Sequence, residues 1–397
     1  MKNIVNIAYS YHNSNKGITR IWTTLPMDHP DVTCTHSPEE KTIDDGNNEL
    51  FYFTLKENEQ FQMNYSIDTY KQNEQKMLTD KEKAFYLRSG TLVVVDEQMR
   101  NLAHEITAGA VTTMEKAKAI FNYTVTQYKY VYPPKGRGTK SFLQAKQGDC
   151  GEYSFLFSSL CRSIGIPCRT LIGSWANGKM GAHVWNELYD EQAGWVPVDC
   201  SLASLQKKKK FQFLFSNIRT LKWTAYFGQL EGQRVVFSYD AELYLSPKYN
   251  DLDKLTIVNS PYPPIAPFQI DGEPFYWGYE AVDGCAPYLQ PVYMQFDQEN
   301  LSLKPNKNEH NYLGKWKITE TGAQGVFLKL KNWSYAAFFV FFTLSLLLSS
   351  PLVSALAAGS IIVTCISYIA RKERILLFTF VTLYFLLFFM SNVIKLV

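Results

Sequence analysis

One of the seven cysteines of the chain stands at the predicted start of a buried helix. Cys150 lies in the sequence GDCGE (148–152), and apolar residues follow it with helical spacing. Asp149 and Glu152 have the spacing of a capping box, so Cys150 should be the first helical residue. The helix dipole and the free N–H groups at that position favour a thiolate, the nucleophilic form of cysteine. The position predicts a reactive thiol as readily as an inert buried cysteine.

Two later segments supply an imidazole and a carboxylate. Residues 182–189 and 195–200 have the composition of strands, with turn residues between them. A hairpin with a three-residue loop over 190–192 would place His183 directly opposite Asp199. Directly opposed residues in an antiparallel pair share a face, with Cβ atoms about 4.5–5.5 Å apart. The hairpin therefore predicts that the two side chains meet.

A cysteine, a histidine and an aspartate in this order suggest nucleophilic chemistry. An aspartate beside His183 would orient the ring and stabilise the imidazolium, which in turn would lower the pKa of a neighbouring thiol. Taken singly, His183 and Asp199 are more simply explained as a histidine within a sheet and a residue at a strand end. Together with Cys150 they predict a Cys-His-Asp triad.

The elements around these residues differ along the chain. Phe61, Met63, Tyr65 and Ile67 alternate with polar residues, which predicts antiparallel strands within residues 1–80. Apolar residues then recur at helical spacing, which predicts a helix after Thr112 or Thr113; the residues of this apolar face are Met114, Ala117, Phe121, Val125 and Tyr128.

The C-terminal region is long and apolar. Three segments, 333–349, 352–370 and 375–394, each approach the length of about 20 residues that a membrane-spanning helix needs. Almost no loop separates the first two, so they should form a tight helical hairpin, with one long kinked span as the alternative. Residues 331–397 are therefore expected to form a transmembrane region.

Basic residues predict the orientation of these spans. Lys329 and Lys331 precede the first span, while Arg371, Lys372 and Arg374 follow the second. A helical hairpin places both groups on one side, which the positive-inside rule assigns to the cytosol. The N-terminal region should then also be cytosolic, in agreement with the lack of an apolar signal-peptide run at its start.

Composition limits the possible partners and cofactors. A net charge of +3 leaves no general nucleic-acid footprint. The odd number of cysteines, without CxxC or Cys/His spacing, favours free thiols in a reduced compartment and argues against a zinc site. No cofactor or metal is expected, and the oligomeric state is not predicted.

The motifs around Cys150, His183 and Asp199 carry a family resemblance. The GDCGE sequence with its following helix, the segment 181–185 and the segment 195–199 resemble the transglutaminase-like superfamily in order and spacing, over roughly residues 117–201. The resemblance implies a papain-like α+β core in which these three residues form the catalytic triad. Members of the family transfer acyl groups from amides through a thioester, although some have lost catalysis.

Further site residues follow less directly. The backbone N–H of Cys150 is a natural oxyanion donor, and Gln144 has the offset from the cysteine that the oxyanion glutamine has in papain-like proteases. Trp175 and Trp185 could shape a binding tunnel for an acceptor, or could belong to the core.

The sequence thus predicts four regions: a β domain over 1–80, a transglutaminase-like catalytic core over 81–258, a Pro-rich connector with further strands over 259–330, and the transmembrane region. The expected function is a membrane-anchored thiol-dependent amide hydrolase or peptidase acting on a peptide or protein. The alternatives are transglutaminase-type transfer to an amine, and a non-catalytic module that binds a peptide or partner at the lipid bilayer.

Overall fold

The computed structural model describes residues 4–14, 17–26, 32–69, 77–132, 134, 136–178, 180–208, 218–248, 268–270, 273–275, 285–286, 292–296, 314–373 and 375–395. They belong to two compact units. One consists of Asn6–Lys210 and Leu221–Ile318, and the other of Met1–Val5, Phe211–Thr220 and Thr319–Val397. The fold is a mixture of α and β, with antiparallel sheets and three C-terminal apolar helices.

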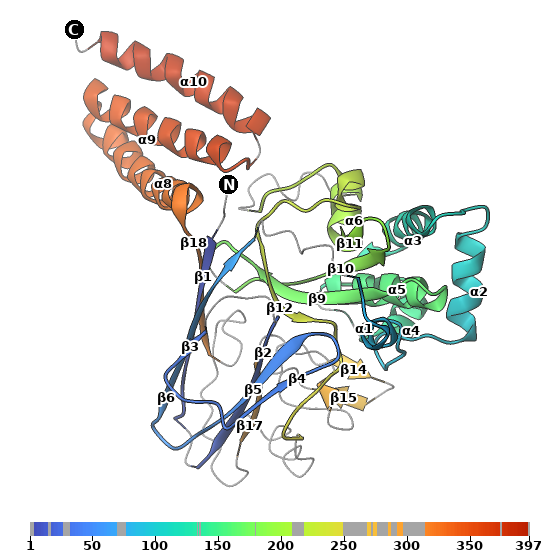
Figure 1. Cartoon of the computed structure of the whole chain (residues 1–397). Helices are drawn as coiled ribbons and strands as arrows, with labels where there is room; N and C mark the ends of the chain where they lie inside the picture. The colour runs from blue at the N-terminus through green and yellow to red at the C-terminus, as the bar shows by residue number, and fades with distance from the viewer. Residues whose placement is uncertain are drawn as a thin grey trace. The chain divides into compact units, whose positions relative to one another are not determined.

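Two of the four-stranded sheets come largely from the first unit (Figure 1). One has the order β18-β1-β6-β3, built from β1 (Ile4–His12), β3 (Thr33–Cys34), β6 (Gln60–Asp68) and β18 (Lys315–Glu320). The other has the order β17-β2-β5-β4, built from β2 (Thr19–Pro26), β4 (Glu40–Ile43), β5 (Asn48–Leu55) and β17 (Val292–Phe296).

The strand prediction for the first 80 residues is confirmed. Along β6, Phe61, Met63 and Tyr65 are buried and alternate with exposed residues, because successive side chains of a strand point to opposite faces. Strands β17 and β18 come from the segment 259–330 and pair with strands of the N-terminal region. Both ends of this unit therefore build the same sheets, which the sequence did not indicate. The Pro-rich connector at 259–267 lies outside the described residues.

The remainder of the first unit combines helices with a third antiparallel sheet of order β11-β10-β9-β12. Its strands are β9 (Cys168–Trp175), β10 (Ala182–Asp190), β11 (Gly194–Val198) and β12 (Arg234–Tyr239). The helices are α1 (Asp80–Phe85), α2 (Glu97–Ile106), α3 (Thr113–Gln127), α4 (Thr139–Ala145), α5 (Cys150–Ser163) and α6 (Cys200–Lys208), with a 3-10 turn η2 (Trp223–Tyr226). Short strands complete it: β7 (Lys129–Tyr130) pairs in parallel with β8 (Gln147–Gly148), β13 (Leu243–Tyr244) pairs with β16 (Cys285–Ala286), and β14 (Phe268–Ile270) pairs with β15 (Glu273–Phe275).

Helix α5 packs against β9 and β10 (Figure 1). Its side chains are buried on every side after Cys150, and Asn186 of β10 donates to the Ser154 carbonyl and to the Ser158 hydroxyl. The helix predicted after Thr112 is confirmed as α3, where the Thr112 hydroxyl accepts from the backbone N–H of Glu115. Together these elements hold the start of α5 in place against the sheet.

The β10–β11 hairpin forms as predicted, but its register differs by two residues. Asp190 pairs with Gly194 and Asn186 with Val198, so His183 has no directly opposed partner on β11. The turn lies one residue later because the Asp190 carboxylate accepts from the N–H groups of Gln192 and Ala193, and Gly194 takes a φ of 71°. A three-residue loop followed by a left-handed residue is a favoured hairpin turn.

The second unit contains the three apolar helices α8 (Gly322–Leu348), α9 (Pro351–Ala370) and α10 (Ile375–Ile394), which lie side by side (Figure 1). Each is long and apolar enough to cross a membrane. Ser349 takes a φ of 47° and Pro351 is the first residue of α9, so the chain turns sharply between two separate helices. The hairpin prediction is confirmed, and α8 starts eleven residues before its apolar segment.

Buried charges gather at one end of this bundle. The Lys331 ammonium lies 2.7 Å from Glu373, whose other oxygen lies 2.7 Å from Arg371. Glu320 pairs with Arg371 at 2.8 Å and with Arg219 at 3.0 Å. The start of α8 and the α9–α10 connection therefore lie at the same end of the bundle, as the hairpin requires.

Candidate active site

Cys150 is the first residue of α5, as the capping box predicted. The Asp149 carboxylate accepts from the Gly151 N–H at 2.8 Å, and the Glu152 carboxylate accepts from the Asp149 N–H at 3.2 Å. These reciprocal bonds satisfy donors at the start of the helix. In the part of the chain that the structure describes, the backbone N–H of Cys150 makes no hydrogen bond, which leaves it available to a ligand.

The two capping carboxylates share one cation. Arg137 Nη1 lies 2.8 Å from Asp149 Oδ1 and 3.0 Å from Glu152 Oε2, and all three side chains are largely buried. Burial raises the pKa of Glu152 to about 8, partly offset by Arg137. For Asp149, the Arg137 charge and the hydrogen bonds outweigh burial and lower the pKa. One negative charge therefore remains beside the cysteine near neutral pH.

The environment of the Cys150 sulfur is apolar. The thiol packs against a buried cluster formed by Leu92, Val93, Phe155, Ile172, Val184 and Ala241. Burial raises the pKa of Cys150 well above its ordinary value and Asp149 raises it further, although a hydrogen bond from the Val184 backbone lowers it. Desolvation and the capping carboxylate therefore oppose the thiolate that the start of a helix would favour.

His183 and Asp199 meet despite the shifted register. His183 Nε2 lies 2.7 Å from Asp199 Oδ2. Asp199 follows the last residue of β11, so its side chain reaches diagonally across the strand end, and its other oxygen accepts from Ser201 and from the Leu202 N–H, both at 2.8 Å. Burial alone would raise the pKa of Asp199, but His183, Arg234 and these hydrogen bonds hold it well below its ordinary value.

The ionised Asp199 decides the roles of the two imidazole nitrogens. A carboxylate can only accept, so Nε2 donates to it, and in the neutral ring Nδ1 carries the lone pair. Nδ1 of His183 makes no hydrogen bond to any described residue. His183 directly precedes Val184, whose backbone N–H acts on the Cys150 sulfur. In the described part of the chain no hydrogen bond joins the sulfur itself to the imidazole.

Both predicted tryptophans lie against the imidazole. Trp175 stacks on His183 with ring centroids 4.7 Å apart, and Trp185 stacks on it at 5.9 Å. Gly173 lies opposite His183 in the β9–β10 register, and a Cβ there would come within 2.7 Å of the Trp185 ring. Both indoles are buried. They pack the imidazole rather than line an open surface, and contact with an acceptor stays a prediction.

Arg234 is a site residue that sequence reasoning did not single out. Its guanidinium lies 2.8 Å from Asp199 Oδ2 and also pairs with Glu231 at 2.6 Å. It lies over the Trp175 and Trp185 rings, at 4.7 and 5.0 Å from their centroids. The sequence did not indicate this role, because the partners of Arg234 come from other segments of the chain.

Tyr130 is a second residue near the candidate site that the sequence analysis did not identify. It pairs with Gly148 across β7 and β8, and its ring stacks on Tyr153 in the first turns of α5 at 6.3 Å. Burial raises the pKa of its phenol well above the ordinary value, and charge on Cys150 and Asp199 raises it further. Tyr130 therefore lies close enough to the candidate nucleophile to interact with it electrostatically.

Gln144 lies on α4 with an exposed side chain. No hydrogen bond joins it to Cys150 within the residues that the structure describes. Its role as an oxyanion donor stays a prediction, and the backbone N–H of Cys150 is better placed by position.

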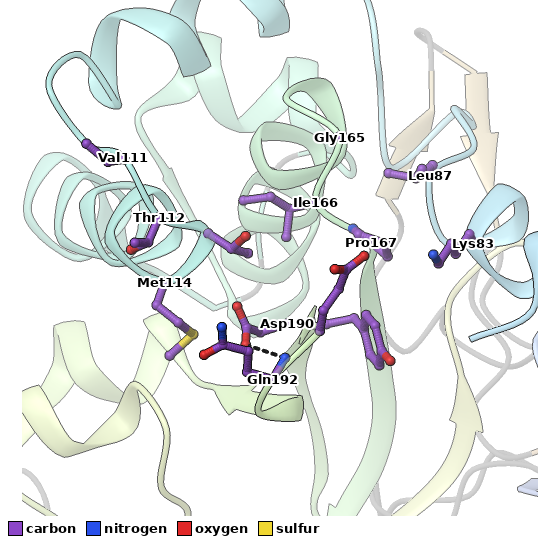
Figure 2. A pocket seen from close by; sticks show the side chains of 13 residues that line it. Lys83, Leu87, Val111, Thr112, Met114, Gly165, Ile166, Pro167, Asp190 and Gln192 are labelled. Carbon is purple, nitrogen blue, oxygen red and sulfur yellow. Dashed lines mark hydrogen bonds between the residues drawn. The ribbon is translucent and has the colours of Figure 1, made fainter. Parts of the chain in front are cut away.

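A pocket of about 640 Å³ lies elsewhere, at the other end of α5. Figure 2 shows that it is lined by the start of α3, the α5–β9 connection with Ile166 and Pro167, and the β10–β11 turn with Asp190 and Gln192. Helix α5 has 14 residues, so Cys150 lies about 20 Å away at 1.5 Å per residue. This pocket is separate from the candidate site.

The chain matches a known family over this region. Residues 100–200, which are 101 of the 397 residues, match the family model of the transglutaminase-like superfamily. This part of the chain is a transglutaminase-like core. The matched segment includes Cys150, His183 and Asp199, and it ends before Arg234. Among curated proteins, none matches the chain in sequence.

The chain also aligns in part with solved structures. A candidate cysteine protease from Cytophaga hutchinsonii is 12% identical with a TM-score of 0.43, covering 80% of this chain and 98% of its own. The periplasmic domain of TgpA from Pseudomonas aeruginosa, bound to ethylmercury, is 13% identical with a TM-score of 0.33, covering 50% and 93%. A structure described as a TGase is 12% identical with a TM-score of 0.24, covering 47% of each chain.

The transglutaminase-like core thus contains two preassembled parts. One is Cys150 at a capped helix start, with a backbone N–H that has no hydrogen-bond partner among the described residues, and the other is a His183–Asp199 pair packed between indoles. Both parts adjoin Val184, which contacts the thiol and follows the histidine.

Proposed function

We propose that the protein is a membrane-anchored thiol amide hydrolase that acts on a peptide or protein substrate. The observation that carries the proposal is the 2.7 Å contact between His183 Nε2 and Asp199 Oδ2, which leaves Nδ1 basic. A protonated Cys150 needs such a base, since the surroundings of the sulfur raise its pKa.

The reaction follows from these roles. His183 Nδ1 removes the thiol proton as the Cys150 sulfur attacks the amide carbonyl, and the Cys150 N–H donates to the developing oxyanion. The imidazolium then protonates the leaving amine, and the C–N bond breaks to give a thioester. His183 next removes a proton from water, which attacks the thioester carbonyl. The C–S bond then breaks to release the acid, and the imidazolium returns its proton to the sulfur, which restores the thiol. Asp199 stabilises the imidazolium in both steps.

The test uses the full chain in detergent micelles. Cleavage of a peptide mixture is followed by mass spectrometry for the wild type, C150A and H183N. We expect no cleavage by C150A, and a rate lower by about 10²–10⁴ for H183N, since it loses the general base. Cleavage by C150A at the wild-type rate would exclude the thiol mechanism. Release of ammonia from a glutamine peptide only when an amine is added would replace hydrolysis by amine transfer.

We further propose that the transglutaminase-like core faces the cytosol. Lys329 and Lys372 are exposed at the end of the bundle where Lys331 and Arg371 are buried. Basic residues at one end favour that end on the cytosolic side. Protease added outside sealed cells should therefore leave residues 1–330 intact, and digest them only after the membrane is opened. Digestion in sealed cells would reverse the orientation.

A further inference from the structure

Arg234 is the first residue of β12 and lies beside the Asp199 carboxylate. Its side chain is 4% exposed, and its hydrogen bonds to described residues all go to carboxylates: Nη1 to Asp199 at 2.8 Å, and Nε and Nη2 to Glu231 at 2.6 and 2.9 Å. The two-pronged contact with Glu231 fixes the plane of the guanidinium. Arg234 is therefore held rigidly with one nitrogen aimed at Asp199.

Arg234 and His183 bind the same oxygen of Asp199. Oδ2 lies 2.7 Å from His183 Nε2 and 2.8 Å from Arg234 Nη1. An oxygen that already accepts from a cation holds a second donor less strongly. Glu231 works in the opposite sense, because its negative charge offsets part of the charge of Arg234.

We propose that Arg234 is a positioning residue that shares the Asp199 carboxylate with His183 and thereby sets how basic the imidazole is. Glu231 tunes this effect from the other side of the guanidinium. The same guanidinium also lies over Trp175 and Trp185, the rings that stack on His183. One side chain thus supports both the acid and the aromatic walls around the histidine.

Other titratable groups face this cluster from neighbouring elements. Tyr226 of η2 interacts with Glu231, Arg234 and Asp199, while the phenol of Tyr130 and the thiol of Cys200 interact with Asp199. All of these groups stay uncharged near neutral pH, because burial raises their pKa values. Within the described residues, Arg234 and Glu231 are therefore the charges available to modulate the His183–Asp199 pair.

The inference rests on the proposed function and predicts opposite effects for two variants. R234Q removes the positive charge that shares Asp199 Oδ2 with His183. The imidazole therefore becomes more basic, and a larger fraction of Cys150 is present as the thiolate. E231Q strengthens the hold of Arg234 on Asp199, so the imidazole becomes less basic. R234K keeps the charge but loses the two-pronged contact with Glu231, so its profile should lie between those of R234Q and the wild type. If Arg234 and Glu231 served only to stabilise the fold, R234Q and E231Q would change the reactivity of Cys150 in the same direction.

The experiment measures alkylation of Cys150 by iodoacetamide in the micelle-solubilised full chain, from pH 5 to 9, by mass spectrometry. Near pH 7 we expect R234Q to react faster and E231Q slower than the wild type. Each change should be about threefold to tenfold, which corresponds to half to one pKa unit. Thermal unfolding of each variant shows that it is folded.

The outcomes separate the two proposals. H183A should slow alkylation of Cys150, and equal rates for H183A and the wild type would contradict the proposed function and with it the role of Arg234. If H183A slows the reaction but R234Q and E231Q shift the profile in the same direction, or not at all, only the role of Arg234 is overturned. If R234Q does not fold, E231Q decides alone, with slower alkylation in support and an equal or faster rate against.

Discussion

The reactivity of Cys150 depends on the residues that control its proton. Its sulfur lies in an apolar cluster beside a carboxylate, so the resting state is a thiol. His183 is oriented by Asp199 and has its second nitrogen free of described partners. Proton transfer during the attack is therefore more consistent with this site than a preformed thiolate.

Tyr130 should assist the same residue. Its phenol stays protonated because burial raises its pKa, and it lies near enough to respond to charge on Cys150. A protonated hydroxyl in that place can donate to the oxyanion or to the sulfur. We expect Y130F to lower kcat/KM on the order of 100-fold. Steady-state kinetics on a cleaved peptide measure the loss.

The matched control for this prediction is Y244F, which changes a phenol that is 70% exposed on β13. It should retain wild-type kinetics. If Y130F does too, Tyr130 contributes only to packing against Tyr153.

At the scale of elements, the capping box at the start of α5 contains a carboxyl group, that of Glu152, which titrates near neutral pH. Glu152 is buried, with a pKa raised to about 8. The pKa of Glu152 is near 4.5 in the unfolded chain and about 8 in the folded protein. Its contribution to the free energy of unfolding is therefore fully present below pH 4.5 and is lost as the pH rises through about 8. We expect the stability of the wild type, relative to E152Q, to fall between about pH 5 and 8. Thermal unfolding of both proteins across this range measures the difference, and parallel curves would contradict it.

The sheet beneath the histidine requires a glycine. A Cβ at Gly173 would lie 2.0 Å from the Val235 carbonyl and 2.7 Å from the Trp185 ring. We expect G173A to separate β9 from β12, displace the ring that stacks on His183, and lower stability by about 1–3 kcal/mol. Thermal unfolding and tryptophan fluorescence report the two effects. Unchanged fluorescence and stability would show that the strands adjust freely.

At the scale of the molecule, a buried ion network holds one end of the apolar bundle together. Glu373 accepts from both Lys331 and Arg371, and each partner is buried. Removing one member of a buried network leaves charges without partners, which costs about 3–5 kcal/mol. We expect E373Q to lower the unfolding temperature of the micelle-solubilised protein clearly.

The neighbouring exposed lysine provides the comparison. K372Q alters a side chain on the surface of the same connection and should leave the unfolding temperature unchanged. If E373Q and K372Q behave alike, the network does not stabilise the bundle.

Local sequence patterns were sufficient to predict many of the helices and strands of this protein. The capping box at Asp149 and Glu152, the alternation along β6 and the apolar runs of the three C-terminal helices predict their elements correctly, because each depends on neighbours within a few residues. The order of Cys150, His183 and Asp199 was likewise sufficient to indicate a transglutaminase-like core.

Only the tertiary structure decided the rest. The His183–Asp199 contact survives a register two residues from the predicted one, because Asp199 reaches across from beyond the strand end. Arg234 joins that pair, and burial together with Asp149 raises the pKa of Cys150. Strands β17 and β18 return to the N-terminal sheets. These features depend on groups far apart in the chain and on exclusion of water. The sequence by itself therefore determined the elements and the candidate residues, while packing decided which groups meet and which of them carry charge.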